Sequence, residues 1–384
     1  MRLGTIADGA AELRLGEATC LVAGAGIGGG IMAVPYLAVR LGFWPSIAVM
    51  AVAYLVTVVL HIMVAELSVR TDCSRELLTI FTTHLFRRRA WLRTVFYGLM
   101  AVTLVCNLAA YISGSGDILA SVLGWPGVLA KTLFFLVAAA VVFLGLKSVA
   151  INEVVSVVVM VLLLAPLVVR TIQLPAHQPL APAHWAISPL LAVYGMAMFA
   201  LSSLFAVPQA ASGLRGNRRH LLVAVSLGLA INLAVMIVIM TCTLASSSPV
   251  TEVAIVGWAA ALGGATRVFG SVFIVLAMMT TFWSISLQLS DITRRFFHAG
   301  RIPGWLIATV PSFALALAPL AGFLSLMQIA GGATAVIVAV MAVPAYTNAV
   351  RDRDGLLLGP IGRSRLLYAA VMVMYLVMAI ASFQ

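Results

Sequence analysis

Apolar runs of about 20 residues recur along almost the whole chain, and each is long enough to cross a lipid bilayer as a helix. Of the 384 residues, 63% are hydrophobic and 9% are charged, whereas soluble domains carry about 25% charged residues. No water-soluble globule of this size could bury so much apolar surface, so we predict an all-α integral membrane protein. The eleven expected spans are residues 18–40, 45–67, 94–122, 128–146, 150–171, 186–209, 220–245, 265–292, 303–320, 323–347 and 365–383.

The basic residues predict which side of the membrane each loop occupies, because Lys and Arg are enriched in cytoplasmic loops. A cytoplasmic N-terminus places only Arg40, Lys131, Arg170 and Arg267 outside, which leaves 19 of the 23 basic residues inside. We therefore expect a multi-pass protein of the bacterial cytoplasmic (inner) membrane whose C-terminus is extracytoplasmic. The basic residues are scattered rather than clustered, so we expect no nucleic-acid partner.

The first span contains an unusual glycine stretch. Five of the seven residues from Gly24 to Gly30 are glycine, and Pro35 follows. The letters "GAGIGG" satisfy G-x-G-x-x-G, but a dinucleotide loop needs a preceding strand and an acid about 20 residues later. No Asp or Glu occurs between Glu17 and Glu66. Glycine and proline weaken helices, so we predict that this span is unwound and lines a substrate site; a close helix-packing face is the alternative.

The sixth span is interrupted in a similar way by Ser202, Ser203, Pro208 and Gly213. Its "FAVPQ" echoes the "MAVPY" of the first span 173 residues earlier. Breaks at corresponding positions in two halves predict an inverted-repeat transporter with its site near the middle of the membrane. We expect a cytoplasmic segment at 1–17, repeats of five helices at 18–172 and 185–348, and an eleventh transmembrane helix at 364–384.

Four motifs in chain order resemble those of bacterial hydroxy/aromatic amino-acid permeases, in the amino acid/auxin permease group of the amino acid–polyamine–organocation superfamily. They are "GAGIGGGIMAVPY", "LAAYISGSGDIL", "FALSSLFAVPQAASGLRGN" and "LAMMTTFWSISLQLSDI". The resemblance implies the LeuT-type fold, a 5+5 inverted repeat plus one extra helix with helices 1 and 6 unwound, and an amino acid as the transported substrate. The chain departs from the family at Phe205-Ala206-Val207, where many members carry His or Gly before the proline.

The resemblance also implies a substrate site. The glycine amides of the first span would hold the substrate carboxylate. Carbonyls near Ala25 and Phe199 would hold the substrate ammonium group, and the side chains of the other residues would line the rest of the pocket. For Tyr111 the alternative is ordinary packing, and for Asn107 it is a helix–helix hydrogen bond. The implied substrate-binding residues are Ala25, Gly26, Gly28, Gly29, Gly30, Asn107, Tyr111, Phe199, Ser202, Ser203 and Phe205.

The eighth span carries a candidate cation site. Ala277, Thr280 and Thr281 resemble the residues that form a sodium site in LeuT-fold transporters, together with first-helix carbonyls at positions like Gly24 and Ile27. Five oxygen ligands suit a hard cation, whereas Ser and Thr hydroxyls in membrane helices often bond back to their own helix. Na⁺ and H⁺ both stay open as the coupling ion, and we expect no other cofactor.

Few ionisable residues lie inside the spans. For His61 we favour a structural hydrogen bond over a proton relay. We expect Glu66, Glu153 and Asp291 at cytoplasmic helix ends near arginines, in gating contacts or ion pairs, and Asp117 near an outer vestibule. Paired acids or a His/metal cluster are missing from the expected spans, so we predict that the protein is not an enzyme.

The function that these patterns favour is secondary active transport. We expect import of a free amino acid by H⁺ or Na⁺ symport with alternating access, by a monomer within the lipid bilayer. The alternative is a membrane-embedded amino-acid sensor, or an exchanger without net ion-coupled uptake.

Overall fold

The computed structural model describes residues 12–74, 77–86, 90–175, 177–179, 181–318, 322–350 and 355–382, and the regular elements within them are all helices. The first eleven residues of the expected N-terminal segment lie outside this described part. So do several arginines on which the predicted orientation depends, namely Arg2, Arg75, Arg87, Arg88, Arg89, Arg351 and Arg353.

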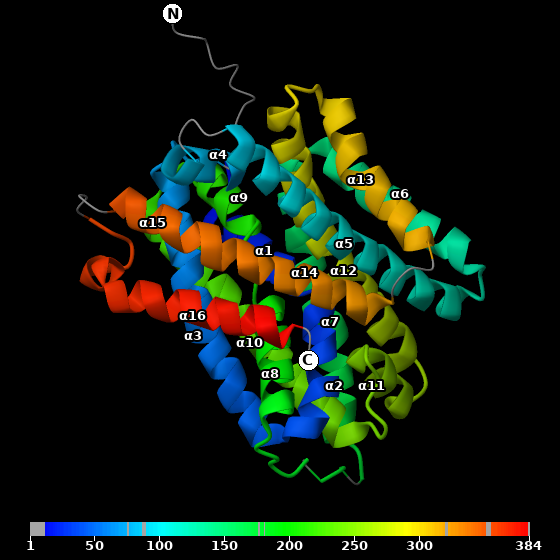
Figure 1. The fold of residues 1–384 in the computed structure, drawn as a ribbon. Helices are drawn as coiled ribbons and strands as arrows, with labels where there is room; N and C mark the ends of the chain where they lie inside the picture. The colour runs from blue at the N-terminus through cyan, green and yellow to red at the C-terminus, as the bar shows by residue number, and fades with distance from the viewer. Residues whose placement is uncertain are drawn as a thin grey trace, which may run out of the picture.

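A helix falls in each of the eleven expected spans (Figure 1). The helices are α1 (Leu15–Gly26), α2 (Gly29–Leu41), α3 (Phe43–Val69), α4 (Leu77–Phe81), η1 (Thr82–Phe86), α5 (Ala90–Leu123), α6 (Gly127–Leu144), α7 (Leu146–Ile172), α8 (Ile187–Ala200), α9 (Ala206–Gly213), α10 (Arg218–Ser246), α11 (Ala254–Leu262), α12 (Thr266–Phe296), α13 (Arg301–Leu317), α14 (Phe323–Ile337), η2 (Val338–Ala342), α15 (Val343–Val350), η3 (Gly359–Arg363) and α16 (Arg365–Ala381).

Length and apolarity identify most of the spans directly. Within the described residues, seven helical stretches are long and apolar enough to cross a bilayer, and the bent pair α1–α2 makes an eighth. The expected sixth, ninth and eleventh spans coincide with the shorter helices α8, α13 and α16. α8 is short because the chain leaves the helix at Ala200 and resumes only in α9.

The first span is broken, as predicted. α1 ends at Gly26 and α2 begins at Gly29, and the two axes are bent by 48°. Pro35 lies inside α2. The helix is therefore interrupted at the glycines and continues through the proline. Ile27 and Gly28 are therefore the non-helical residues of this span.

The sixth span is broken as well, because residues 201–205 separate α8 from α9. Pro208 is the third residue of α9. A proline is tolerated there because the amides of a first helical turn have no partner within the helix. Its position thus favours a new helix start just after the break.

The two broken spans run in opposite directions through the centre of the bundle. In Figure 1, α1 and α9 lie toward one end of the molecule, while α2 and α8 lie toward the other. α1 packs against α7, α10 and α12, and α2 packs against α8. This antiparallel pairing of two interrupted spans is the arrangement that an inverted repeat produces.

Candidate substrate and cation site

A small cavity of about 20 Å³ lies between the two breaks and has room for about one water molecule. Nine of the eleven predicted substrate-binding residues line it, and Gly28 and Gly29 do not. Five further residues complete the lining: Ala200, Thr281, Ser284, Ile285 and Thr334. The structure therefore brings together, around one cavity, residues from five separate regions of the chain.

The glycines of the first span allow polar side chains to approach the backbone. A Cβ at Gly26 would lie 1.6 Å from Asn232 Nδ2, and a Cβ at Gly28 would lie 2.5 Å from Thr281 Oγ1. A Cβ at Gly30 would meet the Ala200 backbone at 3.0 Å. The sequence offered an unwound first span and a close helix-packing face as alternatives. The structure has both.

The start of α2 presents unpaired backbone amides to this region. Gly28 caps the helix without a side-chain bond, and its own N–H donates to the Gly26 carbonyl at 2.8 Å. The N–H groups of Gly29 and Gly30 have no hydrogen-bond partner among the described residues. Free amides at a helix N-terminus favour an anion, and Gly30 borders the cavity.

Hydrogen bonds from neighbouring helices hold the second break in place. The Ser203 N–H donates to His61 Nε2 at 2.9 Å, and His61 Nδ1 lies 2.7 Å from the Thr57 carbonyl oxygen. These partners require the proton on Nδ1. The Ser203 hydroxyl donates to the Val22 carbonyl of α1 at 2.7 Å. The prediction of a structural hydrogen bond for His61 is confirmed.

α5 contributes Asn107 and Tyr111 to the cavity wall. Asn107 is 3% exposed, and its Oδ1 has no hydrogen-bond partner in the described part of the chain. The Tyr111 hydroxyl bonds to Thr281 and lies 3.2 Å from where a Gly28 Cβ would be. Asn107 therefore has an unused acceptor beside the cavity.

The five oxygens of the candidate cation site converge between α1 and α12. Thr280 Oγ1 lies 2.9 Å from the Ala277 carbonyl oxygen and 3.1 Å from that of Gly24. Thr281 Oγ1 lies 3.1 Å from Ala277 O, and 3.5 Å from both Gly24 O and Ile27 O. We call this set the oxygen ring. Carbonyl and hydroxyl oxygens are ligands that hard cations prefer. Both hydroxyls also donate hydrogen bonds to a carbonyl of their own helix.

The sequence expectation for Glu153 is wrong. This residue lies in the second turn of α7, is 0% exposed, and forms no ion pair with an arginine in the described residues. Its Oε1 accepts from the Ser284 hydroxyl at 3.0 Å, and its Oε2 lies 1.8 Å from where a Gly24 Cβ would be. α7 begins four residues before the expected span, and tertiary packing buries this turn against α1 and α12.

Asn232 of α10 is a second polar residue that sequence reasoning missed. It is 0% exposed, and neither of its side-chain polar atoms has a partner among the described residues. A single Asn in the middle of an apolar run, here "GLAINLAVMI", is the signal that could have identified it.

Glu66 and Asp291 lie near arginines as expected, and the vestibule position expected for Asp117 stays a prediction. Asp291 pairs with Arg294 at 3.8 Å. Asp117 pairs with Lys131 at 3.4 Å, and its side chain is 67% exposed, which places it away from the cavity wall. Glu66 is at the centre of an ion-pair network.

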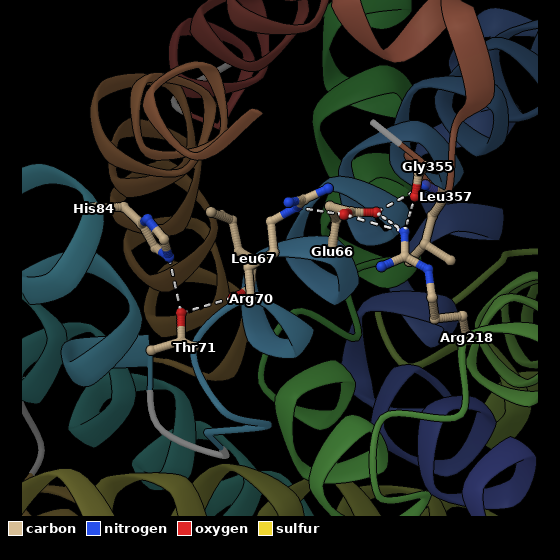
Figure 2. A network of polar contacts seen from close by, with 8 residues as sticks. All are labelled: Glu66, Leu67, Arg70, Thr71, His84, Arg218, Gly355 and Leu357. Carbon is tan, nitrogen blue, oxygen red and sulfur yellow. Dashed lines mark hydrogen bonds and ion pairs between the residues drawn. The ribbon is translucent and has the colours of Figure 1, made fainter. Parts of the chain in front are cut away.

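Figure 2 shows this network at the C-terminal end of α3. The buried Glu66 carboxylate accepts from Arg70 Nε at 2.5 Å, from Arg218 Nη2 at 2.9 Å and from the Leu357 N–H at 2.7 Å. Arg218 also donates to the Gly355 carbonyl. The network joins α3, the start of α10 and the segment after α15. The expected arginines are therefore present at Glu66 as ion pairs, and a gating role for them stays a prediction.

A second pocket of about 180 Å³ lies beside the central cavity and shares Phe199 with it. Its lining includes Tyr36 and Arg40, whose guanidinium lies 5.9 Å from the Tyr36 ring centroid. The Phe199 ring packs between α2 and α14, close to Gly30 and Gly331. Phe199 is thus part of the partition between the two spaces.

Two antiparallel broken helices around a buried mid-bundle cavity define the LeuT-type fold, and solved structures agree. An Eremococcus coleocola manganese transporter, solved with an aromatic bis-isothiourea compound, matches with a TM-score of 0.68 and 14% identity over 97% of this chain and 88% of its own. MhsT in complex with L-phenylalanine matches with a TM-score of 0.67 and 15% identity over 96% of this chain and 99% of its own.

The family follows from the sequence. A sequence model of the tryptophan/tyrosine permease family matches residues 14–382, and the chain belongs to this family. A search of curated protein sequences found no significant match. The protein is a multi-pass membrane protein and a secondary transporter of amino acids, not an enzyme.

Proposed function

We propose that the protein imports an aromatic amino acid across the bacterial cytoplasmic membrane, with its N-terminus inside, by symport with Na⁺ or H⁺. The observation that carries this proposal is the position of the cavity, which both helix breaks border. Backbone groups without helical partners at membrane depth are costly unless they bind something. A zwitterionic amino acid supplies both an anion and a cation to such groups.

Each part of the substrate has a matching part of the site. The free amides of Gly29 and Gly30, at the positive end of α2, suit the carboxylate. Carbonyls near Ala25 and Phe199 suit the ammonium group. An aromatic substrate side chain is suited by aromatic rings and hydroxyl groups. The cavity lining contains both, in Tyr111, Phe205 and the two serines Ser202 and Ser203. An aromatic substrate is also supported by the family description and by MhsT, which was solved with L-phenylalanine.

Transport requires the cavity to change size. Its volume of about 20 Å³ is far too small for an aromatic amino acid, so binding requires movement of the lining helices or rotamers. Phe199 stands between this cavity and the neighbouring pocket of about 180 Å³. A rotation of this ring would open the central site on that side, as alternating access requires.

The oxygen ring offers a route for coupling. It takes carbonyls from α1 and both hydroxyls from α12. A cation bound there would hold these two helices together and order the break next to the substrate. Ion binding and substrate binding would then favour the same conformation, and the coupling would be reciprocal.

Uptake into proteoliposomes tests the proposal. Radiolabelled tryptophan, tyrosine and phenylalanine would be offered under an inward Na⁺ gradient, an inward H⁺ gradient, or neither. Accumulation above the equilibrium level under one gradient is the expected result. Uptake that requires preloaded internal amino acid would show an exchanger, and binding without any flux would show a sensor; either outcome contradicts symport.

A pair of variants links the uptake to the cavity. Asn107→Leu removes the unused acceptor in the wall and should reduce substrate affinity at least tenfold. Asn152→Leu is the matched control, because Asn152 bonds to the Ser148 carbonyl of its own helix and does not line the cavity. Equal affinities of the two variants would contradict the assigned site.

A further inference from the structure

A pocket of about 410 Å³ lies where the end of α2 meets two loops. Its wall comes from the last turns of α2, from the loop between α7 and α8, and from the end of α10 with the loop that follows. The volume falls within the range of about 300–1,000 Å³ that is typical of small-molecule sites. We call this space the outer pocket, because the sequence pattern places its Arg40 on the outer side of the membrane.

Backbone contacts hold the walls of the outer pocket together. The Gln178 N–H donates to the Ala245 carbonyl at 2.8 Å, and the Phe43 N–H donates to the Ala181 carbonyl at 3.2 Å. Gly42, at a φ of 100°, allows the loop to approach, because a Cβ there would lie 2.3 Å from the Pro182 carbonyl oxygen. The loop between α7 and α8 is thus fastened to both neighbouring helices, and the pocket is formed before a ligand arrives.

Arg40 brings a positive charge without a counterion into this pocket. Its guanidinium lies 5.9 Å from the Tyr36 ring centroid, and ion pairs to it are absent from the described part of the chain. Among the residues that the structure describes, no Asp or Glu lines the pocket. Ser247 also lines it, is 5% exposed, and has a hydroxyl without a described partner. These polar groups favour an anionic ligand.

The outer pocket is continuous with the route to the central cavity. It shares Tyr36 and Arg40 with the pocket of about 180 Å³, and that pocket shares Phe199 with the cavity of about 20 Å³. The three spaces therefore lie in series. Arg40 stands at the first junction, and the Phe199 ring stands at the second.

We propose that the outer pocket is a first binding site for the incoming amino acid, in which the Arg40 guanidinium pairs with the substrate carboxylate. A guanidinium presents parallel N–H groups that match the two oxygens of a carboxylate. The Tyr36 ring and the apolar side chains of Leu244 and Val250 give an aromatic side chain a surface to pack against. This inference rests on the proposed function, because its ligand is the transported amino acid.

The outer pocket and the central cavity should accept different parts of the substrate. Carbonyls near Ala25 and Phe199 suit an ammonium group in the central cavity, whereas the described lining of the outer pocket contains no acid. Indole-3-propionate has the aromatic ring and the carboxylate without the amine, so it should bind in the outer pocket. Tryptamine has the amine without the carboxylate and should not bind there.

Protection of an introduced thiol tests the proposal on the purified full-length protein. Ser248 is exposed and lines the outer pocket, so Ser248→Cys places a reactive group at the site. The rate of its reaction with a charged maleimide would be measured at fixed pH against increasing indole-3-propionate, tryptophan or tryptamine, with the labelling of the wild type subtracted. Arg40→Gln is the test variant in this background. Arg267→Gln is the matched control, because Arg267 is exposed, is expected on the same side and does not line the pocket.

Indole-3-propionate and tryptophan should slow the labelling in a saturable way, and tryptamine should not. Arg40→Gln should raise the half-protecting concentration of indole-3-propionate at least tenfold, while Arg267→Gln leaves it unchanged. Asn107→Leu, which acts on the central cavity, should also leave it unchanged. In proteoliposomes, Arg40→Gln should raise the KM for tryptophan uptake at least threefold with the same kcat, and high salt should reduce the difference because it screens exposed charges.

Three results would overturn the inference: no protection by indole-3-propionate, equal protection by tryptamine, or equal half-protecting concentrations in Arg40→Gln and Arg267→Gln. A shift caused by Asn107→Leu would place the protecting ligand in the central cavity and would also overturn it. The uptake assay separates this inference from the proposed function. Normal uptake without protection defeats only the outer site, whereas Arg40-dependent protection without any uptake defeats the transport proposal and leaves the outer site as a ligand site.

Discussion

The backbone N–H of Ser203 donates a 2.9 Å hydrogen bond to Nε2 of His61. A side chain of α3 thus accepts a hydrogen bond from the non-helical backbone of the sixth span. Both residues are buried, at 1% and 0% exposed. The bond satisfies a backbone donor that the interruption of the helix leaves free. It therefore fixes the position of the break relative to α3.

Replacement of His61 should destabilise the protein. His61→Phe retains a ring and removes the acceptor, leaving the Ser203 N–H buried and unpaired, at a cost of about 1–3 kcal/mol. The melting temperature of the purified protein should fall by several degrees. His220→Phe is the control, because His220 is exposed at the start of α10. A His61→Phe protein as stable as the control would contradict this role.

Side chains added to the glycines of α1 should have opposite effects at its two ends. Gly26→Ala forces a Cβ to within 1.6 Å of Asn232 Nδ2 and should cost about 1–3 kcal/mol through overpacking. Gly16→Ala, in the same helix, has no neighbour within 4 Å and should be neutral or stabilise by about 0.5–1 kcal/mol.

Thermal melts and amino-acid binding check this prediction together. Gly26→Ala should lose both stability and substrate affinity, because the break forms the cavity wall. If Gly26→Ala behaves like Gly16→Ala in both measurements, the close approach of Asn232 has no energetic consequence.

The Glu66 network should contribute more than a surface ion pair. Glu66→Gln removes the negative charge that two arginines share and weakens the contact to the Leu357 N–H, and removal of a buried partner costs on the order of 3 kcal/mol. Arg215→Gln is the comparison, because its pair with Glu12 is exposed on both sides and should contribute about 1 kcal/mol or less. Melting measured at low and high salt should show the larger loss for Glu66→Gln at both concentrations.

His84 should make stability depend on pH. Burial, with a smaller contribution from the positive charge of Arg70, lowers the pKa of His84 below its ordinary 6.5. Above pH 6.5 the imidazole is neutral whether or not its segment is folded. As the pH falls through 6.5, the unfolded segment binds a proton more readily than the folded one, so stability decreases.

Melting temperatures between pH 8 and pH 5 check the sign. The wild type should lose stability below about pH 6.5, and the Thr71–His84 contact of 2.9 Å should be affected first. His84→Gln should show a shallower decline over the same interval. Identical slopes for the two proteins would show that other groups cause the pH dependence.

Phe199 should control access to the substrate cavity. Phe199→Ala joins the cavity of about 20 Å³ to the pocket of about 180 Å³ and removes an aromatic contact. Loss of one aromatic contact costs about 0.5–1.5 kcal/mol, which corresponds to a roughly two- to tenfold weaker affinity for the substrate. The substrate should also dissociate faster. Phe297→Ala, on a 53% exposed ring, is the control. Unchanged affinity and release in Phe199→Ala would contradict a gating role.

The sequence by itself determined the membrane class, the positions of the spans and the first break. These features are local, since a helix crosses a bilayer if about 20 consecutive residues are apolar, and glycines weaken a helix wherever they cluster. The residues of the cavity wall were also largely predictable, but only through the resemblance of the motifs to a known family.

Only the tertiary structure decided which polar groups meet at those breaks. Glu153 reaches Gly24, Asn232 reaches Gly26, and His61 bonds to a residue 142 positions away. The sequence expectation put Glu153 at a helix end beside arginines, because its distance from the span boundary said nothing about the direction of its side chain. That direction depends on the rotation and tilt of α7 against α1 and α12, and packing between distant segments sets both.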